Sequence, residues 1–214
     1  MARELLLMRH GKSAWPLDVA DYNRPLKKRG RKAALAIGEW LLASQQVPDW
    51  IVSSQADRAR ETAEKVCKGL RLNPAKHLIF DDRIYEAGPE ELKQVLADCP
   101  GYKSRVLLIG HNPGLDQLLL ALADQPPPLD QDGKILGTAH LARLSLPDDW
   151  QQLGLGCGQL RGIIRPADLP DAAVEITDPE SQHQSAELVS DLQPAKSRRL
   201  IRAWLQRLVM RAEN

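Results

Sequence analysis

Short apolar runs alternate with segments of helical periodicity over most of the chain. The strand-like runs cover residues 4–8, 50–52, 78–80 and 105–109. Apolar residues recur at helical spacing over 27–43, 57–70, a segment opened by Pro89, and 115–123. Strands that alternate with helices in this way predict an α/β fold, with a mostly parallel central sheet and helices on both of its faces.

The clearest strand is 105–109, because an uninterrupted apolar run is typical of a strand buried in a parallel sheet. Gly110 then turns the chain out of the sheet. Asn112 is a good N-cap and Pro113 suits the first helical position. We therefore expect the helix over 115–123 to begin beside the intervening histidine.

The pattern changes after residue 124. A proline-rich loop leads to strand-like alternation over 139–146, with which 159–165 is expected to pair as a hairpin. We expect one domain over 1–169, followed by a polar linker over 170–186. Residues 187–214 predict a basic amphipathic helix. Such a helix can bind a partner, but more often packs on its own domain, which is the interpretation that we favour.

Composition excludes several classes of function. The 29 basic and 28 acidic residues leave a formal charge of +1, which gives no reason to expect a nucleic-acid partner. Apolar runs too short to cross a bilayer, and a first strand without a signal sequence before it, predict a cytoplasmic protein that does not bind membranes. Cys67, Cys99 and Cys157 form no CxxC pair, and acidic residues and histidines lack ligand spacing, so buried thiols and no metal are expected.

Two of the strand-end turns each carry a histidine. His10 follows the first strand, and His111 follows the strand over 105–109. In open α/β sheets the turns at the carboxyl ends of the strands line the ligand crevice, so the two imidazoles are expected to lie together. Arg58 falls in the first turn of the next helix. Arg60 is expected to point away from it, because neighbours two apart on a helix diverge by about 200°.

Several motifs here resemble those of the histidine phosphatase superfamily, which includes the cofactor-dependent phosphoglycerate mutases. The hallmark is Leu7-Met8-Arg9-His10-Gly11. The motifs most resemble the SixA-type phosphohistidine phosphatases in Arg9-His10-Gly11-Lys12-Ser13, Asp21-Tyr22-Asn23-Arg24-Pro25-Leu26 followed by Arg29-Gly30, Ser53-Ser54 with Arg58-Ala59 and Glu61-Thr62, and Gly110-His111-Asn112. Their order and their placement on the expected elements argue against chance agreement.

The resemblance implies a phosphoglycerate mutase-like fold and a phosphatase that forms a phosphohistidine on itself. Carried over by position, it makes His10 the nucleophile, with Arg9, Arg58 and His111 as the positive pocket that binds phosphate. It implies phosphohistidine, on a protein or in a small molecule, or a small phosphomonoester as the substrate. It implies no cofactor.

The chemistry of phosphoryl transfer agrees with these roles. The transferred group spreads negative charge over its equatorial oxygens, which guanidinium groups and an imidazolium stabilise. His10 must be neutral to attack, and a backbone carbonyl is expected to hold its second ring nitrogen. His111 is expected to act best when protonated, a form that nearby phosphate favours.

Weaker signals point to three further residues. Glu86 lies where many superfamily members place their proton donor, although SixA-type relatives often depart from a strict glutamate there, and it can instead be a solvated loop residue. Asp21 is expected to help shape the entrance, together with Arg24, and to bind substrate. Lys12 can attract an anionic substrate or be solvated. Arg24 and Arg60 are interpreted as surface or structural salt-bridge residues.

Two other functions stay open at this point. A phosphate-recognition module would bind a phosphorylated partner without turnover, with the basic tail as the contact. A mutase would transfer the phosphoryl group to a second sugar acid, but Pro16 stands where mutases commonly have asparagine, and their long lid insertions are missing. With little to exclude water, hydrolysis is the favoured outcome.

Overall fold

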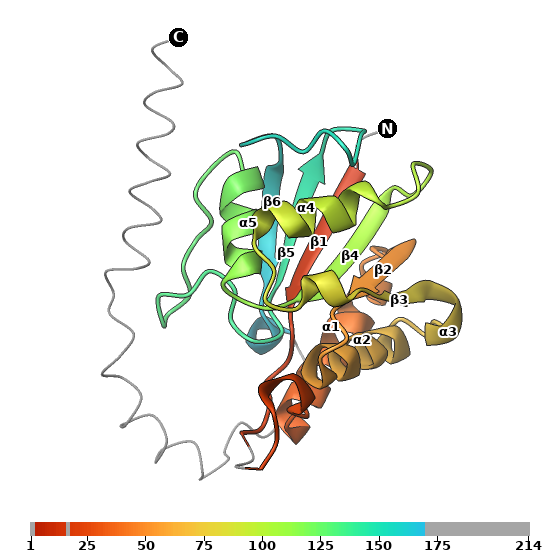
Figure 1. Cartoon of the computed structure of the whole chain (residues 1–214), viewed down its shortest axis with the longest axis vertical. Helices are drawn as coiled ribbons and strands as arrows, with labels where there is room; N and C mark the ends of the chain where they lie inside the picture. The colour runs from red at the N-terminus through yellow and green to blue at the C-terminus, as the bar shows by residue number, and fades with distance from the viewer. Residues whose placement is uncertain (1–2, 16–17, 170–214) are drawn as a thin grey trace.

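The computed structural model describes residues 3–15 and 18–169, and these form one six-stranded sheet with helices around it (Figure 1). The expected linker over 170–186 and helix over 187–214 lie outside the described residues. The strands are β1 (Arg3–Arg9), β2 (Trp50–Ser53), β3 (Leu78–Phe80), β4 (Arg105–Gly110), β5 (Leu141–Leu146) and β6 (Gln159–Ile164).

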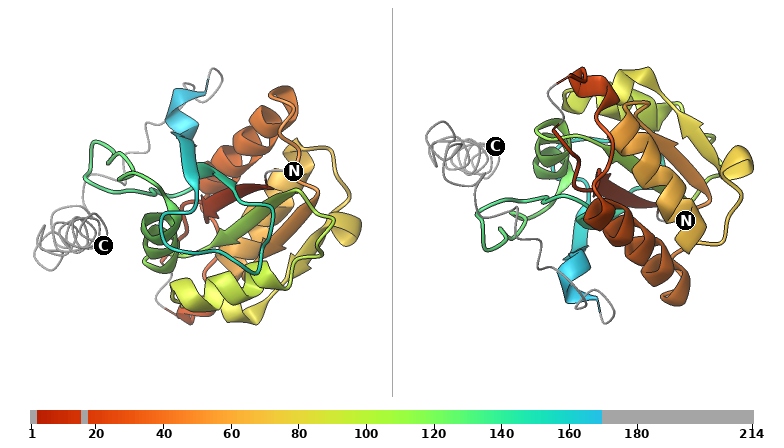
Figure 2. Two further views of the ribbon diagram at one scale, coloured as in Figure 1. Left: turned by 90° about the horizontal axis from the view of Figure 1, so that it is seen from above. Right: turned by 90° about the horizontal axis from the view of Figure 1, so that it is seen from below.

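The sheet has the order β3-β2-β4-β1-β5-β6. Its first four strands run parallel, whereas β5 is antiparallel to β1 and forms the expected hairpin with β6. The helices are α1 (Lys28–Ala43), α2 (Asp57–Gly69), the short α3 (Pro74–His77), α4 (Pro89–Ala97) and α5 (Gly114–Leu122). Figure 2 shows the sheet between α1 and α2 on one side and α4 and α5 on the other. The predicted fold class is confirmed.

Alternate residues of β1 belong to the two halves of the core. Leu5 and Leu7 pack in one cluster with the buried leucines of α4 and α5. Leu6 and Met8 pack in the opposite cluster with the buried residues of α1 and α2. All four side chains are fully buried, because β1 lies inside the sheet and has helices on both faces. The first strand is therefore held rigidly up to its carboxyl end.

Helices α1 and α2 approach each other closely enough for backbone to touch backbone. A Cβ atom built at Gly38 would lie 2.3 Å from the carbonyl oxygen of Val66, and one at Gly69 would lie 2.5 Å from that of Leu35. Only glycine fits at either position, since real Cβ atoms do not come so close to a carbonyl. The two helices therefore form one packed unit.

The start of α5 differs from the prediction. Asn112 does not cap the helix, and Pro113 precedes it instead of forming its first residue. The Asn112 side chain instead donates hydrogen bonds to the carboxylate of Asp116 and to the carbonyl oxygen of Leu136, both at 2.9 Å. The Asn112 side chain thus contacts a loop distant in sequence instead of capping the helix, as its local preference predicted.

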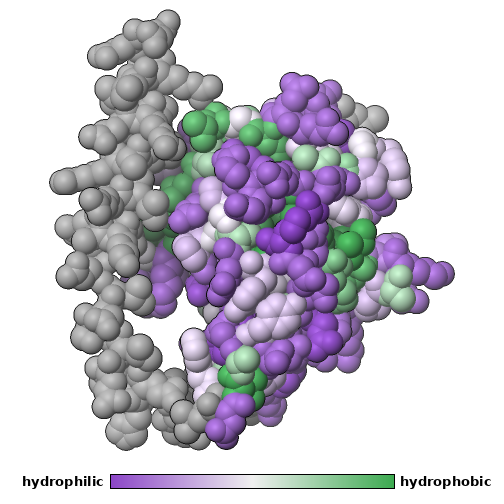
Figure 3. All heavy atoms as spheres, viewed as in Figure 1, coloured by the Kyte–Doolittle hydropathy of each residue, from purple (hydrophilic) through white to green (hydrophobic). Residues whose placement is uncertain are grey.

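The surface in Figure 3 is mostly hydrophilic, with hydrophobic residues in small separate groups. Across residues 3–15 and 18–169, none of the helices combines the length and the hydropathy that a bilayer crossing requires. The cytoplasmic location stays a prediction. Cys67 and Cys99 are buried free thiols, as expected, and Cys157 is partly buried.

Candidate active site

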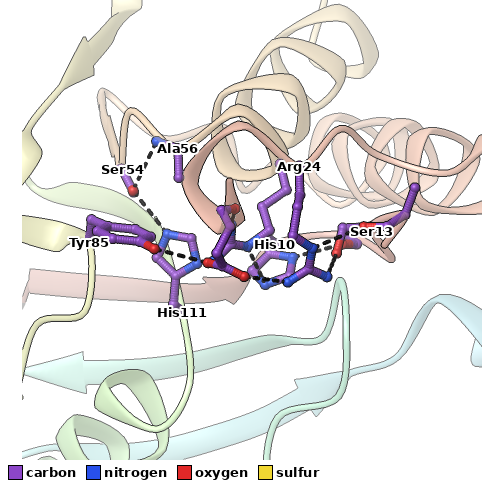
Figure 4. Close-up of polar contacts among 11 residues, drawn as sticks. His10, Ser13, Arg24, Ser54, Ala56, Tyr85 and His111 are labelled. Carbon is purple, nitrogen blue, oxygen red and sulfur yellow. Dashed lines mark hydrogen bonds and ion pairs between the residues drawn. The ribbon is translucent and has the colours of Figure 1, made fainter. Parts of the chain in front are cut away.

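The carboxyl ends of β1 and β4 bring the two motif histidines together. The strands pair in parallel with Arg9 opposite Gly110, so that His10 and His111 occupy equivalent places just beyond them. The ring centroids lie 5.1 Å apart, and each residue is only 8% exposed. Figure 4 shows the two imidazoles beside each other. The expectation that the sheet topology joins them is confirmed.

His10 is held as a neutral imidazole with a defined tautomer. Its Nδ1 lies 2.7 Å from the carbonyl oxygen of Gly11, which can only accept, so Nδ1 carries the proton. Its Nε2 accepts a hydrogen bond from Nε of Arg58 at 3.3 Å, which requires a free lone pair on Nε2. Burial, followed by the proximity of His111, lowers the pKa of His10 well below its usual range. The nitrogen that faces Arg58 is therefore nucleophilic at neutral pH.

The turn that carries His10 is fixed from behind by helix α2. The backbone N–H of Gly11 donates to Oγ1 of Thr62 at 2.9 Å, and that hydroxyl donates to the carbonyl oxygen of Arg58 at 2.6 Å. A Cβ atom at Gly30 would lie 2.3 Å from the carbonyl oxygen of Lys12, so α1 also presses on this turn. Two helices thus determine where the imidazole sits.

Arg58 stands in the first turn of α2 and is 6% exposed. Besides its bond to His10, it donates from Nη1 to the carbonyl oxygen of Asp21 at 2.6 Å and from Nη2 to the carboxylate of the same residue at 2.8 Å. Arg60 points away and pairs with Asp57 at the surface, at 2.6 Å. The divergence expected from helix geometry is confirmed.

His111 is positioned by Ser54 and by the start of α5. Nε2 of His111 lies 2.9 Å from Oγ of Ser54, which also accepts a hydrogen bond from the N–H of Ala56 at 3.3 Å. The carbonyl oxygen of His111 accepts from the N–H of Leu115 at 3.0 Å, so the helix begins beside it. Nδ1 is buried and has no hydrogen-bond partner within the described part of the chain.

The protonation of His111 depends on what the pocket holds. Burial and then the charge of Arg58 lower its pKa to about 3, so the imidazole is neutral in the ligand-free protein. A phosphate group would supply the opposite charge and raise this pKa. The protonated form expected from the sequence is therefore confined to the state in which an anion is bound.

Arg9 brings a second guanidinium charge close to the two imidazoles. Its Nη1 donates to the carbonyl oxygen of Leu136 at 2.9 Å, which anchors the side chain to the loop before β5. Its Nε is buried and unpartnered among residues 3–15 and 18–169. Burial lowers the pKa of Arg9, but an arginine stays charged in proteins. A fixed cation with a spare donor suits an anionic ligand.

Asp21 places a carboxylate at the edge of this pocket. It accepts hydrogen bonds from Arg58, from Nη1 of Arg24 at 2.6 Å and from the hydroxyl of Tyr85 at 2.9 Å. Burial opposes ionisation, but the bonds from Arg24 and Tyr85 and the charge of Arg58 outweigh it and lower the pKa of Asp21 to about 2. The carboxylate is thus ionised at neutral pH and holds Arg58 in place.

The remaining two predicted residues lie further out. Glu86 is exposed, in a left-handed backbone conformation with φ of 56°, directly after Tyr85. Lys12 is exposed among other cations, including Arg29 and Lys134. Their catalytic and binding roles stay predictions.

Four further residues build the site, and of these, sequence reasoning assigned a role only to Arg24, as a salt-bridge residue that helps to shape the entrance. Tyr85 packs edge-on against His111 with ring centroids 5.4 Å apart, and Arg24 is 6% exposed and donates from Nη2 to Oγ of Ser13 at 2.6 Å. Ser54 and Thr62 are fully buried polar residues. Ser54 and Thr62 belong to the motif around Arg58, and this position in the motif could have identified them. No local sequence pattern indicated a role for Tyr85.

The cluster therefore joins a neutral imidazole with a free lone pair, two guanidinium groups and a second imidazole with a spare ring nitrogen. Such a set can hold a tetrahedral anion and attack it. In the described ranges, no group of three or more His, Cys, Asp and Glu side chains is arranged to hold a metal ion.

Comparisons with known proteins indicate the family of this chain. The family model described as the histidine phosphatase superfamily (branch 1) matches residues 5–89. An uncharacterised protein of Mycobacterium tuberculosis is 30% identical over 163 residues, which cover 74% of this chain and 99% of that protein.

Solved structures share the fold. The structure assigned as phosphohistidine phosphatase SixA from Nakamurella multipartitia matches with a TM-score of 0.66 and 27% identity, over 78% of this chain and 97% of that chain. The protein histidine phosphatase SixA complexed with tungstate matches with a TM-score of 0.62 and 22% identity, over 77% and 97%, which shows likeness of fold alone. The present chain spans nearly the full length of each.

Proposed function

Because this chain belongs to the histidine phosphatase superfamily and is of the SixA type, we propose that it hydrolyses phosphohistidine, on a protein or in a small molecule, through a phosphohistidine formed on His10. The superfamily also includes mutases, but the SixA-type match makes this chain a phosphohydrolase. The substrate and the roles of individual residues are the proposal.

The observation that carries the proposal is the tautomer of His10. A proton on Nδ1, held by the carbonyl of Gly11, leaves the Nε2 lone pair for attack, and this lone pair already accepts from Arg58. Here one nitrogen is reserved beside a guanidinium group and a second imidazole, as in-line attack on phosphorus requires.

In the first step, Nε2 of His10 attacks the phosphorus, the N–P bond forms, and the bond to the leaving group breaks with its electron pair going to that group. Arg9 and Arg58 stabilise the charge on the equatorial oxygens. His111 accepts a proton in the presence of the phosphate dianion and then donates to a phosphate oxygen. The side chain of His10 becomes positively charged, and the carbonyl of Gly11 compensates its Nδ1–H group.

In the second step, water attacks the phosphorus on the side opposite Nε2, the N–P bond breaks, and orthophosphate leaves. The electron pair returns to Nε2, so His10 is neutral again for the next cycle. Water loses its proton to the phosphate oxygens or to solvent.

The protonation state of the nearby carboxylate favours a nitrogen leaving group. An alkoxide needs a proton from a general acid, whereas imidazole departs with little help. Asp21, the carboxylate that contacts Arg58, has a pKa of about 2 and holds no proton to give at neutral pH. Glu86 is exposed and remains the proposed donor for alkyl phosphates. Phosphohistidine is therefore the preferred substrate class, in line with the name carried by the related SixA structure.

The test is direct trapping of the intermediate. Wild type, His10→Ala and the control His77→Ala, which lies remote on α3, are mixed with ³²P-labelled phosphohistidine and quenched in alkaline detergent, which preserves an N–P bond. We expect label on wild type and His77→Ala, its loss on acid treatment, and none on His10→Ala. Label that persists in His10→Ala would contradict the proposal.

Substrate class is tested with the same three proteins. Phosphate release is measured from a phosphohistidine peptide, p-nitrophenyl phosphate and an alkyl phosphate at pH 7. We expect kcat/KM to fall in that order, since the leaving group worsens in that order. Equal or reversed values would contradict the assignment of the substrate class while leaving the nucleophile untouched.

A further inference from the structure

A partly buried carboxylate on α5 is used by neither chemical step. Asp116 accepts a hydrogen bond from the N–H of Leu136 on Oδ1 at 3.1 Å and one from Nδ2 of Asn112 on Oδ2 at 2.9 Å. Each carboxylate oxygen therefore holds a different segment of the chain. One is the loop before β5, and the other is the turn that carries His111.

The same segments hold Arg9. The carbonyl oxygen of Leu136 accepts from Nη1 of Arg9 at 2.9 Å and from Nδ2 of Asn112 at 2.9 Å. Asp116 thus holds the N–H group of Leu136, and the carbonyl oxygen of the same residue orients Arg9. Since Arg9 precedes His10 and Asn112 follows His111, the carboxylate ties together the turns that bear both imidazoles.

The charges of Asp116 and Arg9 favour each other, whereas the charge of Asp130 favours Arg9 but opposes the ionisation of Asp116. Asp116 is the largest favourable charge acting on Arg9, and Arg9 is the largest favourable charge acting on Asp116. Asp130, in the loop before β5, is the other carboxylate that acts on both. Burial nevertheless dominates and raises the pKa of Asp116 to about 6. The carboxylate is thus charged at pH 7 and loses its charge under mild acid.

We propose that Asp116 is a positioning residue for the phosphate pocket, which holds the guanidinium group of Arg9 in place through Leu136 and couples it to the turn of His111 through Asn112. The expected effect of Asp116 on turnover depends on the function proposed above. The effect on the position of Arg9 is independent of whether the protein hydrolyses phosphohistidine.

The first experiment compares Asp116→Asn with the matched control Asp130→Asn. Both partners of Asp116 are donors, so an amide at 116 sets its own NH₂ group against one of them and releases either Leu136 or Asn112. Asp130 contributes a similar charge, yet in the described part of the chain its carboxylate accepts hydrogen bonds from the N–H groups of Asp132 and Lys134, within its own loop. We expect kcat/KM to fall by about 10- to 100-fold in Asp116→Asn, as for a small misplacement of a binding group. Equal losses in the two variants would overturn the proposal in favour of a simple charge effect.

A pH profile separates positioning from a general loss of structure. Below pH 6 the wild-type carboxyl becomes protonated and resembles the amide, so the ratio of kcat/KM between wild type and Asp116→Asn is expected to shrink towards one as the pH falls from 7.5 to 5. The ratio cancels the ionisation of the substrate and of His10. A ratio that stays constant over this range would overturn the proposal.

A second readout needs no activity. The ¹⁵N chemical shift of Nε of Arg9, assigned with Arg9→Lys, is followed with and without inorganic tungstate. We expect the signal to move in Asp116→Asn but not in Asp130→Asn, and the dissociation constant for tungstate to rise about tenfold or more in Asp116→Asn alone. In wild type, the same signal is expected to titrate near pH 6 as Asp116 becomes protonated. This measurement tests the proposal even if Asp116→Asn does not fold.

These outcomes distinguish two kinds of failure. An Arg9 signal that is unaffected by the loss of Asp116, and unaffected by pH near 6 in wild type, would overturn the positioning role. Absence of turnover in wild type, with the Arg9 signal and tungstate affinity responding as expected, would overturn the proposed function and leave the positioning role supported.

Discussion

Nε of Arg58 donates a hydrogen bond to Nε2 of His10 at 3.3 Å, and the two Nη atoms of the same guanidinium group are taken by Asp21. The proposed nucleophile and its charge stabiliser are therefore joined before any substrate arrives. This contact keeps the lone pair of Nε2 facing the pocket. A phosphoryl group bound at Nε2 would therefore lie directly beside the guanidinium group of Arg58.

Replacement of Arg58 by lysine is expected to lower kcat/KM by about 10²- to 10³-fold, the usual loss for one preorganised donor. A lysine ammonium keeps the charge but cannot contact His10 and both acceptors of Asp21 in one planar arrangement. Steady-state hydrolysis of p-nitrophenyl phosphate measures the effect. Arg60→Lys is the control, because Arg60 lies on the same helix and pairs only at the surface; similar losses in the two variants would contradict the role of Arg58.

Replacement of Glu86 by glutamine tests the proposed proton donor. An amide cannot donate the proton that an alkoxide needs, so we expect kcat for an alkyl phosphate to fall by about 10²-fold or more. Hydrolysis of phosphohistidine should change little, since imidazole leaves without such help. Both rates are measured at pH 7 on one enzyme preparation. A uniform loss for both substrates would show that Glu86 acts in some other way.

The stability of the fold is expected to depend on pH through His111. Its folded pKa of about 3 lies below the unfolded value of 6.5, so between these values the unfolded chain binds a proton that the folded protein does not. Stability contributed by His111 is therefore complete above pH 6.5 and is lost as the pH falls. Urea unfolding at pH 7.5, 6.5, 5.5 and 4.5 should show His111→Gln gaining on wild type by about 1.4 kcal/mol per pH unit below 6.5.

The comparison with His111→Gln removes contributions common to both proteins. Asp116 acts in the opposite direction between its folded pKa of about 6 and the unfolded value of 3.8, because there the folded protein binds the extra proton. That contribution is present in wild type and variant alike. A stability difference that stays constant with pH would contradict a neutral, buried His111.

Substitution of Gly30 tests how α1 supports the turn of His10. A Cβ atom there would lie 2.3 Å from the carbonyl oxygen of Lys12, whereas one at Gly101 would meet nothing within 4 Å. We expect Gly30→Ala to lower the free energy of unfolding by about 1–3 kcal/mol, as for other overpacked sites, although alanine is the better helix former. Urea denaturation measures this, and Gly101→Ala is the control. Equal stability of the two variants would mean that α1 moves aside freely.

Much of the site follows from rules that act along the chain. The buried strand patterns of β1 and β4 predict strands of one mostly parallel sheet, and the carboxyl ends of such strands place His10 and His111 at one edge of it. The structure adds that the two strands are neighbours. Helical periodicity likewise separates Arg58 from Arg60. These features depend on the direction and spacing of residues within single elements, which the amino-acid pattern specifies.

The rest depends on contacts between segments that lie far apart in sequence. Asn112 has the local chemistry of a helix cap, but Leu136 and Asp116 compete for its amide in three dimensions. The hydroxyl of Tyr85, which follows η2 (Asp82–Ile84), donates to Asp21, which lies 64 residues earlier in the chain. Loop paths of this kind are set by tertiary packing, and no periodicity in the sequence reports them.

The backbone contact of α1 with α2 at Gly38 and Gly69 has an effect far beyond the helices themselves. Any side chain introduced there would wedge the pair apart and tilt the amino end of α2, on which the guanidinium of Arg58 and the hydroxyl of Thr62 are mounted. A variant of this kind would retain every reactive group and still turn over poorly. A survey of natural variants that considers only the residues of the active site would miss Gly38 and Gly69, although the placement of Arg58 depends on them.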